Sequence, residues 1–117
     1  MILYHITKEK YLPSILTDGL KINSGKTGFC NKSSHSTYKK YYGMQPIFLT
    51  NDVDFIIKTM LTSGWILKNK AIILEVNIEL NDNNSNCGWY DGELNPKEFR
   101  YFFNIESKNI KLSNIGV

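Results

Sequence analysis

Short apolar runs and two helical periodicities predict an α+β domain with about six strands and two helices. The strand-like runs are 2–6, 20–22, 47–50, 71–80, 98–103 and 110–112. Apolar residues recur at helical spacing over 8–18 and 53–67. The run 71–80 is continuously apolar in its first half and alternates in its second, which is typical of a central strand that emerges at one end of a sheet.

Capping residues mark the ends of the two predicted helices. We expect Thr7 to cap the first helix and Gly19 to end it. Asn51 or Asp52 is expected to cap the second helix. The segment 23–45 shows no periodicity, and a loop of about 23 residues in a small domain is mostly functional or mobile.

The C-terminal part is expected to place a loop before a strand rich in aromatic residues. The pattern predicts an Asn/Asp/Ser turn over 82–86 and a loop over 89–96 that carries Asp91 and Glu93. Glu98 then opens the aromatic strand.

The composition is that of one small globular domain spanning residues 1–117. Its 42% hydrophobic residues exclude a disordered chain, and no apolar run approaches the roughly 20 residues of a membrane span. The N-terminus lacks the pattern of a signal peptide, so we expect a cytoplasmic monomer without membrane contact. Cys30 and Cys87 match neither a disulfide framework nor a metal-ligand spacing, so we expect two free thiols and no metal site.

The formal net charge of +3 is unevenly distributed along the chain. Residues 1–50 carry seven lysines against Glu9 and Asp18, and the stretch 21–50 contains lysines but no acidic residue. Two interpretations stay open. The stretch is either a solvated basic loop or a surface for the phosphates of a dinucleotide or a nucleic acid.

Few titratable residues stand in a pattern typical of catalysis. The sequence has no Ser-His-Asp order, no glycine-rich phosphate loop and no paired histidines for a metal. His5 lies within the first strand and Glu98 opens a late one. Taken alone, such a histidine is more often a hydrogen-bonded core residue and such a glutamate a solvated one.

Taken in order, several segments resemble the catalytic domain of ADP-ribosyltransferases. In that superfamily a strand ending in His and a small or hydroxyl residue precedes a helix of the form I-L-x-x-G-L, as 3–7 and 15–20 do here. A second motif is an aromatic-bearing strand, here with Phe48 where many relatives have Tyr, and a third is a strand opened by the catalytic glutamate. The matching segments are 3–7, 15–22, 47–50, 73–76, 97–101 and 104–112. The opening is closer to the DNA-modifying DarT-type toxins than to the poly-ADP-ribose polymerases.

The resemblance implies a split β-sandwich that uses NAD as co-substrate and transfers one ADP-ribose to a macromolecular acceptor. A nucleic acid base, a protein side chain and a small molecule stay open as acceptors. The DarT-like opening and the basic stretch 21–50 favour a nucleic acid or a nucleic-acid-binding protein.

The resemblance also implies that Glu98 is catalytic, because a carboxylate stabilises the oxocarbenium-like cation formed when nicotinamide leaves ribose. Glu93 is the competing carboxylate. Six residues are implied to bind NAD: His5, Ile6, Thr7, Tyr41, Tyr42 and Phe48.

Each of these residues suits its implied role. His5 would bind a ribose hydroxyl and position the dinucleotide. The backbone of Ile6 would bind the nicotinamide amide, with Thr7 nearby. Phe48 and one of the two tyrosines would stack on the nicotinamide ring.

Two other functions stay open. One is a non-catalytic binding or inhibitor protein that keeps the fold, such as a small phage-borne anti-defence protein, and the missing hydroxyl at Phe48 favours it. The other is transfer of an RNA 2′-phosphate to NAD, which relies on several Arg and His ligands. Since Arg100 is the single arginine of the chain, the sequence disfavours this third function.

Overall fold

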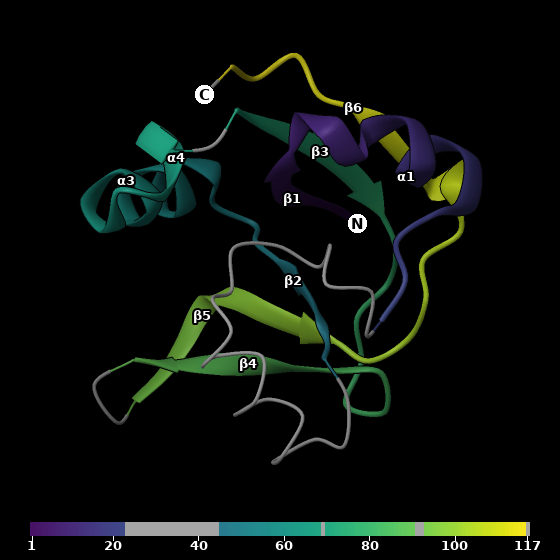
Figure 1. Ribbon diagram of the computed structural model, residues 1–117. Helices are drawn as coiled ribbons and strands as arrows, with labels where there is room; N and C mark the ends of the chain where they lie inside the picture. The colour runs from purple at the N-terminus through teal and green to yellow at the C-terminus, as the bar shows by residue number, and fades with distance from the viewer. Residues whose placement is uncertain (23–44, 69, 91–92, 117) are drawn as a thin grey trace.

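The computed structural model describes residues 1–22, 45–68, 70–90 and 93–116. In these ranges six strands form two antiparallel three-stranded sheets, ordered β1–β3–β6 and β2–β5–β4 (Figure 1). The strands are β1 Ile2–Lys8, β2 Ile47–Leu49, β3 Ala71–Asn77, β4 Ser85–Tyr90, β5 Glu93–Tyr101 and β6 Ile110–Leu112. The helices are η1 Glu9–Tyr11, α1 Leu12–Asp18, α3 Val53–Ser63, α4 Trp65–Lys68 and η2 Ser107–Asn109. The predicted α+β class is confirmed.

β3 is the central strand of the first sheet, as its apolar pattern predicted. It pairs with β1 over seven residues and with β6 over three. Leu74 and Val76 of β3 are fully buried, which agrees with a strand that has neighbours on both edges.

The second sheet corrects the prediction for the C-terminal part. Residues 89–96 are not a loop: β4 and β5 pair as a hairpin that includes most of them, and Glu98 therefore lies inside β5 instead of opening a strand. Gly88 and Pro96 lie within the two strands, and these residue types ordinarily indicate a break in a strand. Their presence is the reason that the apolar pattern did not indicate the pairing.

The helices follow the prediction except at their boundaries. β1 continues through Lys8, so Thr7 is a strand residue and not a helix cap, and η1 precedes α1. Gly19 ends α1 with a φ of 81°. The Asp52 carboxylate caps α3 by accepting the N–H of Phe55 at 3.1 Å. Gly64, with a φ of 79°, separates α3 from α4 within the predicted second helix.

No helix in the described ranges is long and apolar enough to cross a membrane.

The predicted strand 20–22 does not form. Leu20 forms one isolated bridge with Ile105, in which each N–H donates to the other carbonyl. This bridge connects the end of α1 to the segment that leads into β6.

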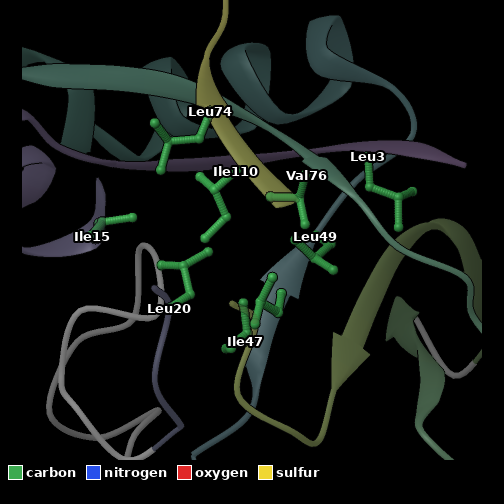
Figure 2. Close-up of a cluster of buried hydrophobic side chains, with 9 residues drawn as sticks. Leu3, Ile15, Leu20, Ile47, Leu49, Leu74, Val76 and Ile110 are labelled. Atoms are coloured by element: carbon green, nitrogen blue, oxygen red, sulfur yellow. The ribbon is translucent and has the colours of Figure 1, made fainter. Parts of the chain in front are cut away.

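Two apolar clusters hold the elements together, one on each face of β1. The first joins both sheets and α1, and Figure 2 shows its side chains converging from these elements. Its buried members are Leu3, Ile15, Leu20, Ile47, Leu49, Leu74, Val76, Ile105 and Ile110. In the second cluster, Ile56 and Met60 of α3 pack on Ile6 and Ile73. The first cluster links the sheets because its buried members come from β1, β3 and β6 of one sheet and from β2 of the other. Full burial of each such side chain contributes roughly 1.5–3 kcal/mol.

Candidate functional site

One buried threonine connects three elements around the candidate site. The Tyr4 N–H donates to the Thr50 carbonyl at 2.8 Å, and the Thr50 N–H donates to the Tyr4 carbonyl at 2.9 Å. The Thr50 hydroxyl accepts the Asp52 N–H at 2.9 Å and donates to the Lys97 carbonyl at 2.5 Å. Thr50 is 3% exposed. It therefore joins β1, the start of α3 and β5 at a single point.

Glu98 lies in an irregular part of β5. The ladder with β4 pairs Cys87 with Phe99 and then Gly88 with Asn95, so residues 96–98 have no counterpart in β4. A proline at the start of this bulge has no N–H to donate, and the next carbonyl, that of Lys97, accepts from Thr50. Bulges of this kind redirect a side chain and are frequent beside active sites.

A small hollow opens beside the Glu98 carboxylate. Its lining comes from β1, β2, α3 and β5: Tyr4, Ile6, Phe48, Leu49, Thr50, Ile56 and Glu98. We call it the Glu98 hollow. About 10 Å³ of it is accessible to the centre of a water molecule, which is close to room for one water. The structure thus brings together three residues named from the family resemblance, Ile6, Phe48 and Glu98.

The Glu98 carboxylate is subject to two opposing influences. Burial raises the pKa of Glu98, and the positive charge of Arg100 lowers this pKa less strongly. The Glu98 side chain is 20% exposed, and its Oε1 lies 4.0 Å from Nη2 of Arg100. Arg100 is buried and donates from Nη1 to the Cys87 carbonyl at 3.3 Å. This carboxylate is partly removed from water, where its charge acts more strongly on a neighbouring group.

His5 has a different environment from that of Glu98. Its ring is fully buried, and Nδ1 lies 2.7 Å from the Phe48 carbonyl. A carbonyl only accepts, so Nδ1 carries the proton. Along β1, His5 shares its face with Leu3 and Thr7, opposite to Tyr4 and Ile6.

The structure therefore does not place the His5 ring in the Glu98 hollow, and the ring would have to become accessible to reach a ligand. Thr7 is likewise buried, at 1% exposure. Tyr41 and Tyr42 lie outside the described residues.

A larger cleft of about 740 Å³ adjoins the hollow through Tyr4, which lines both. Its lining residues are Tyr4, Asn51, Asp52, Val53, Asp54, Lys97 and Ile115. We call it the Asp52 cleft. An ion pair of 3.0 Å joins Lys97 Nζ to Asp52 Oδ2, and the Lys97 ammonium lies 5.5 Å from the centre of the Phe55 ring.

This ion pair favours the ionised form of Asp52. Hydrogen bonds from Lys97 and from the Phe55 N–H lower the pKa of Asp52. The volume of the cleft is within the range of small-molecule sites, which is about 300–1,000 Å³. The volume of the Glu98 hollow is far below it.

Sequence reasoning did not identify Thr50, Lys97 or Arg100 as site residues. The Thr50 hydroxyl contacts the Lys97 carbonyl, and these two residues are 47 positions apart in the sequence, so no local pattern indicates the contact. The one available signal was that Arg100 is the single arginine of the chain and stands two positions after Glu98, on the same face of a strand.

In the part of the chain that the structure describes, no three His, Cys, Asp or Glu side chains lie close enough together to hold a metal ion. No protein-family model, curated protein or solved structure matches this chain.

Proposed function

We propose that this protein is a mono-ADP-ribosyltransferase that moves ADP-ribose from NAD to a macromolecular acceptor, in the manner of a cytoplasmic toxin or phage effector. One observation carries the proposal. The partly buried Glu98 carboxylate shares a hollow with Ile6 and Phe48. These three residues come from three different strands, and the family resemblance names all three for one site.

The chemistry requires a stabilised cation. When the bond between nicotinamide and ribose C1′ breaks, its electron pair leaves with nicotinamide and the sugar becomes oxocarbenium-like. Glu98 accepts a hydrogen bond from a ribose hydroxyl and opposes this positive charge. This electrostatic effect is largest where water is excluded. The apolar side chains of Ile6 and Phe48 reduce the access of water to the hollow. The acceptor then donates a lone pair to C1′ and loses a proton.

The two adjoining spaces suggest how NAD is accommodated. The Asp52 cleft has the volume of a ligand site, and the Glu98 hollow has room for about one water. For the nicotinamide end to reach Glu98, the side chains that line the hollow have to move apart. Tyr4 and Phe48 are the aromatic side chains at this point, and Phe48 can then stack on the nicotinamide ring.

The acceptor we propose is a nucleic acid or a nucleic-acid-binding protein. The support for it is the excess of lysines in the N-terminal half of the chain.

Two measurements on the wild-type protein test the proposal. Saturating NAD, at about 100 times its dissociation constant, should stabilise the fold by roughly 2.7 kcal/mol and raise the melting temperature. NAD labelled on its adenylate part should transfer label to a component of a cell lysate, and digestion with nuclease or protease then identifies the acceptor class. The proposal is contradicted if NAD neither stabilises the protein nor donates label to any lysate component.

A second candidate is a non-catalytic binding protein that retains this fold. The small volume of the Glu98 hollow and the full burial of His5 favour it, because neither position is open to a dinucleotide as the structure stands. This second function predicts that NAD does not change the melting temperature and that no label is transferred to an acceptor. It also predicts that the wild-type chain retains a protein partner in a binding assay.

A further inference from the structure

A groove lined by lysines lies apart from the candidate site. It has a volume of about 410 Å³, and its lining residues are Lys8, Glu9, Lys10, Pro13, Lys68 and Lys70. We call it the lysine groove. None of its described lining residues also lines the Glu98 hollow or the Asp52 cleft.

Two segments distant in sequence build the lysine groove. One is the end of β1 with the turn that follows, and the other is the end of α4 with the residue before β3. Lys8 is paired with Ala71 in the sheet, and the Glu9 N–H donates to the Lys70 carbonyl at 2.8 Å. These backbone contacts hold the two segments next to each other at Lys8, Glu9 and Lys70.

The charge of the groove is strongly positive. Its described lining residues include four lysines and one acid, Glu9, which pairs with Lys70 at 3.3 Å. The resulting excess of +3 equals the formal net charge of the whole chain. Lys10 and Lys68 are exposed, and the Lys70 side chain is 82% exposed. The ammonium groups therefore stay hydrated at the surface and do not enclose a small anion.

We propose that the lysine groove binds the sugar–phosphate backbone of a nucleic acid. Exposed lysines around an open groove attract successive phosphates and release their counterions, which gives affinity without dependence on sequence. Among the described residues that line the groove there is no arginine, the planar side chain that reads guanine with two fixed hydrogen bonds. This inference goes beyond the proposed transferase activity and does not rest on it, because it involves none of the residues around Glu98.

The test measures binding of a labelled DNA duplex of about 20 base pairs by fluorescence anisotropy, between about 50 and 200 mM salt. For the wild type we expect binding that weakens with salt and does not depend on sequence. The double variant Lys10→Gln/Lys68→Gln should weaken binding about tenfold at the lower salt. It should also reduce the slope of log K against log salt by about 2, since each lost phosphate contact contributes about 0.9.

The matched control is Lys58→Gln/Lys108→Gln, which removes the same charge from exposed lysines outside the groove. This variant should bind within about twofold of the wild type. The proposal is overturned if the wild type does not bind DNA at the lower salt, or if the control weakens binding as much as the groove variant. It is also overturned if anionic lipid vesicles or polyglutamate compete as well as DNA does, because the groove would then not be specific for a nucleic acid. Thermal melting of both variants verifies that each is folded.

Discussion

At the scale of single residues, the charge on Glu98 opposes the stability of the fold. Burial raises the pKa of its carboxyl above the ordinary value of about 4.3. Because its pKa is raised in the folded state, ionising the Glu98 carboxyl destabilises the fold. The protonated carboxyl contributes its full stability below the unfolded-state pKa, and this contribution is lost as pH rises through the folded-state pKa.

Glu98→Gln removes this dependence on pH. We expect the variant to become more stable relative to the wild type as pH rises from about 4 to 7, with the difference within about 1 kcal/mol. Urea unfolding at both pH values measures it. Glu106→Gln, at an exposed carboxylate, controls for the chemical change. A Glu98→Gln protein that loses stability relative to wild type as pH rises would show that Arg100 outweighs burial.

The Thr50 hydroxyl is the second residue-scale feature with a measurable consequence. Thr50→Val keeps the shape of the side chain and leaves the Asp52 N–H and the Lys97 carbonyl without this partner. We expect a loss of about 1–3 kcal/mol in the free energy of unfolding, the range for buried groups left unsatisfied. Thr59→Val is the matched control. Its exposed hydroxyl donates to the Phe55 carbonyl within α3, so the change should stay within about 0.5 kcal/mol.

At the scale of elements, the end of α1 depends on the absence of a side chain at Gly19. A Cβ added there would lie 2.1 Å from the carbonyl oxygen of Ile105, and the φ of 81° is unfavourable for any other residue. Gly19→Ala should therefore destabilise the protein by at least about 2 kcal/mol in chemical denaturation. Gly64→Ala separates the two causes, because a Cβ at Gly64 meets nothing within 4 Å and only the strained φ remains. Equal losses for the two variants would contradict the steric argument.

The sequence predicted five of the six strands that the described residues form, and it placed the sixth at 20–22, whereas in the structure the sixth is β4. Residues 71–77 and 110–112 carry strong apolar signals and form β3 and β6 as expected. β4 was missed because its pairing with β5 tolerates Gly88 and a three-residue bulge, features that depend on the partner strand. The aromatic run predicts that Glu98 opens a strand, whereas its position at the bulge follows from contacts with β4 and Thr50 that no local pattern encodes.

For the candidate site, the family resemblance implied Ile6, Phe48 and Glu98, which line one hollow. It did not indicate that His5 faces the other side of β1, although the alternation of the strand contains this information. The role of Thr50 depends on the bridge between the two sheets. Such contacts between distant segments are determined by tertiary packing and not by local propensity.

At the scale of the whole molecule, stability rests on the packed clusters between and beside the sheets. Cys87 is a free thiol, and Cys30 lies outside the described residues. We therefore expect the melting temperature to be the same with and without reductant. A large drop on adding reductant would mean that a disulfide contributes to stability, by a typical 2–4 kcal/mol.

The central claim, that Glu98 stabilises the transition state of ADP-ribosyl transfer, is tested most directly by comparing Glu98→Gln with the wild type in the transfer of label from NAD. Glutamine keeps the size of the side chain and removes its charge. We predict that NAD binding stays largely intact while transfer falls at least about a hundredfold, the scale of losing one preorganised electrostatic group. Glu93→Gln, five positions earlier in the same strand, should have little effect. A folded Glu98→Gln protein that keeps full transfer activity would contradict the account.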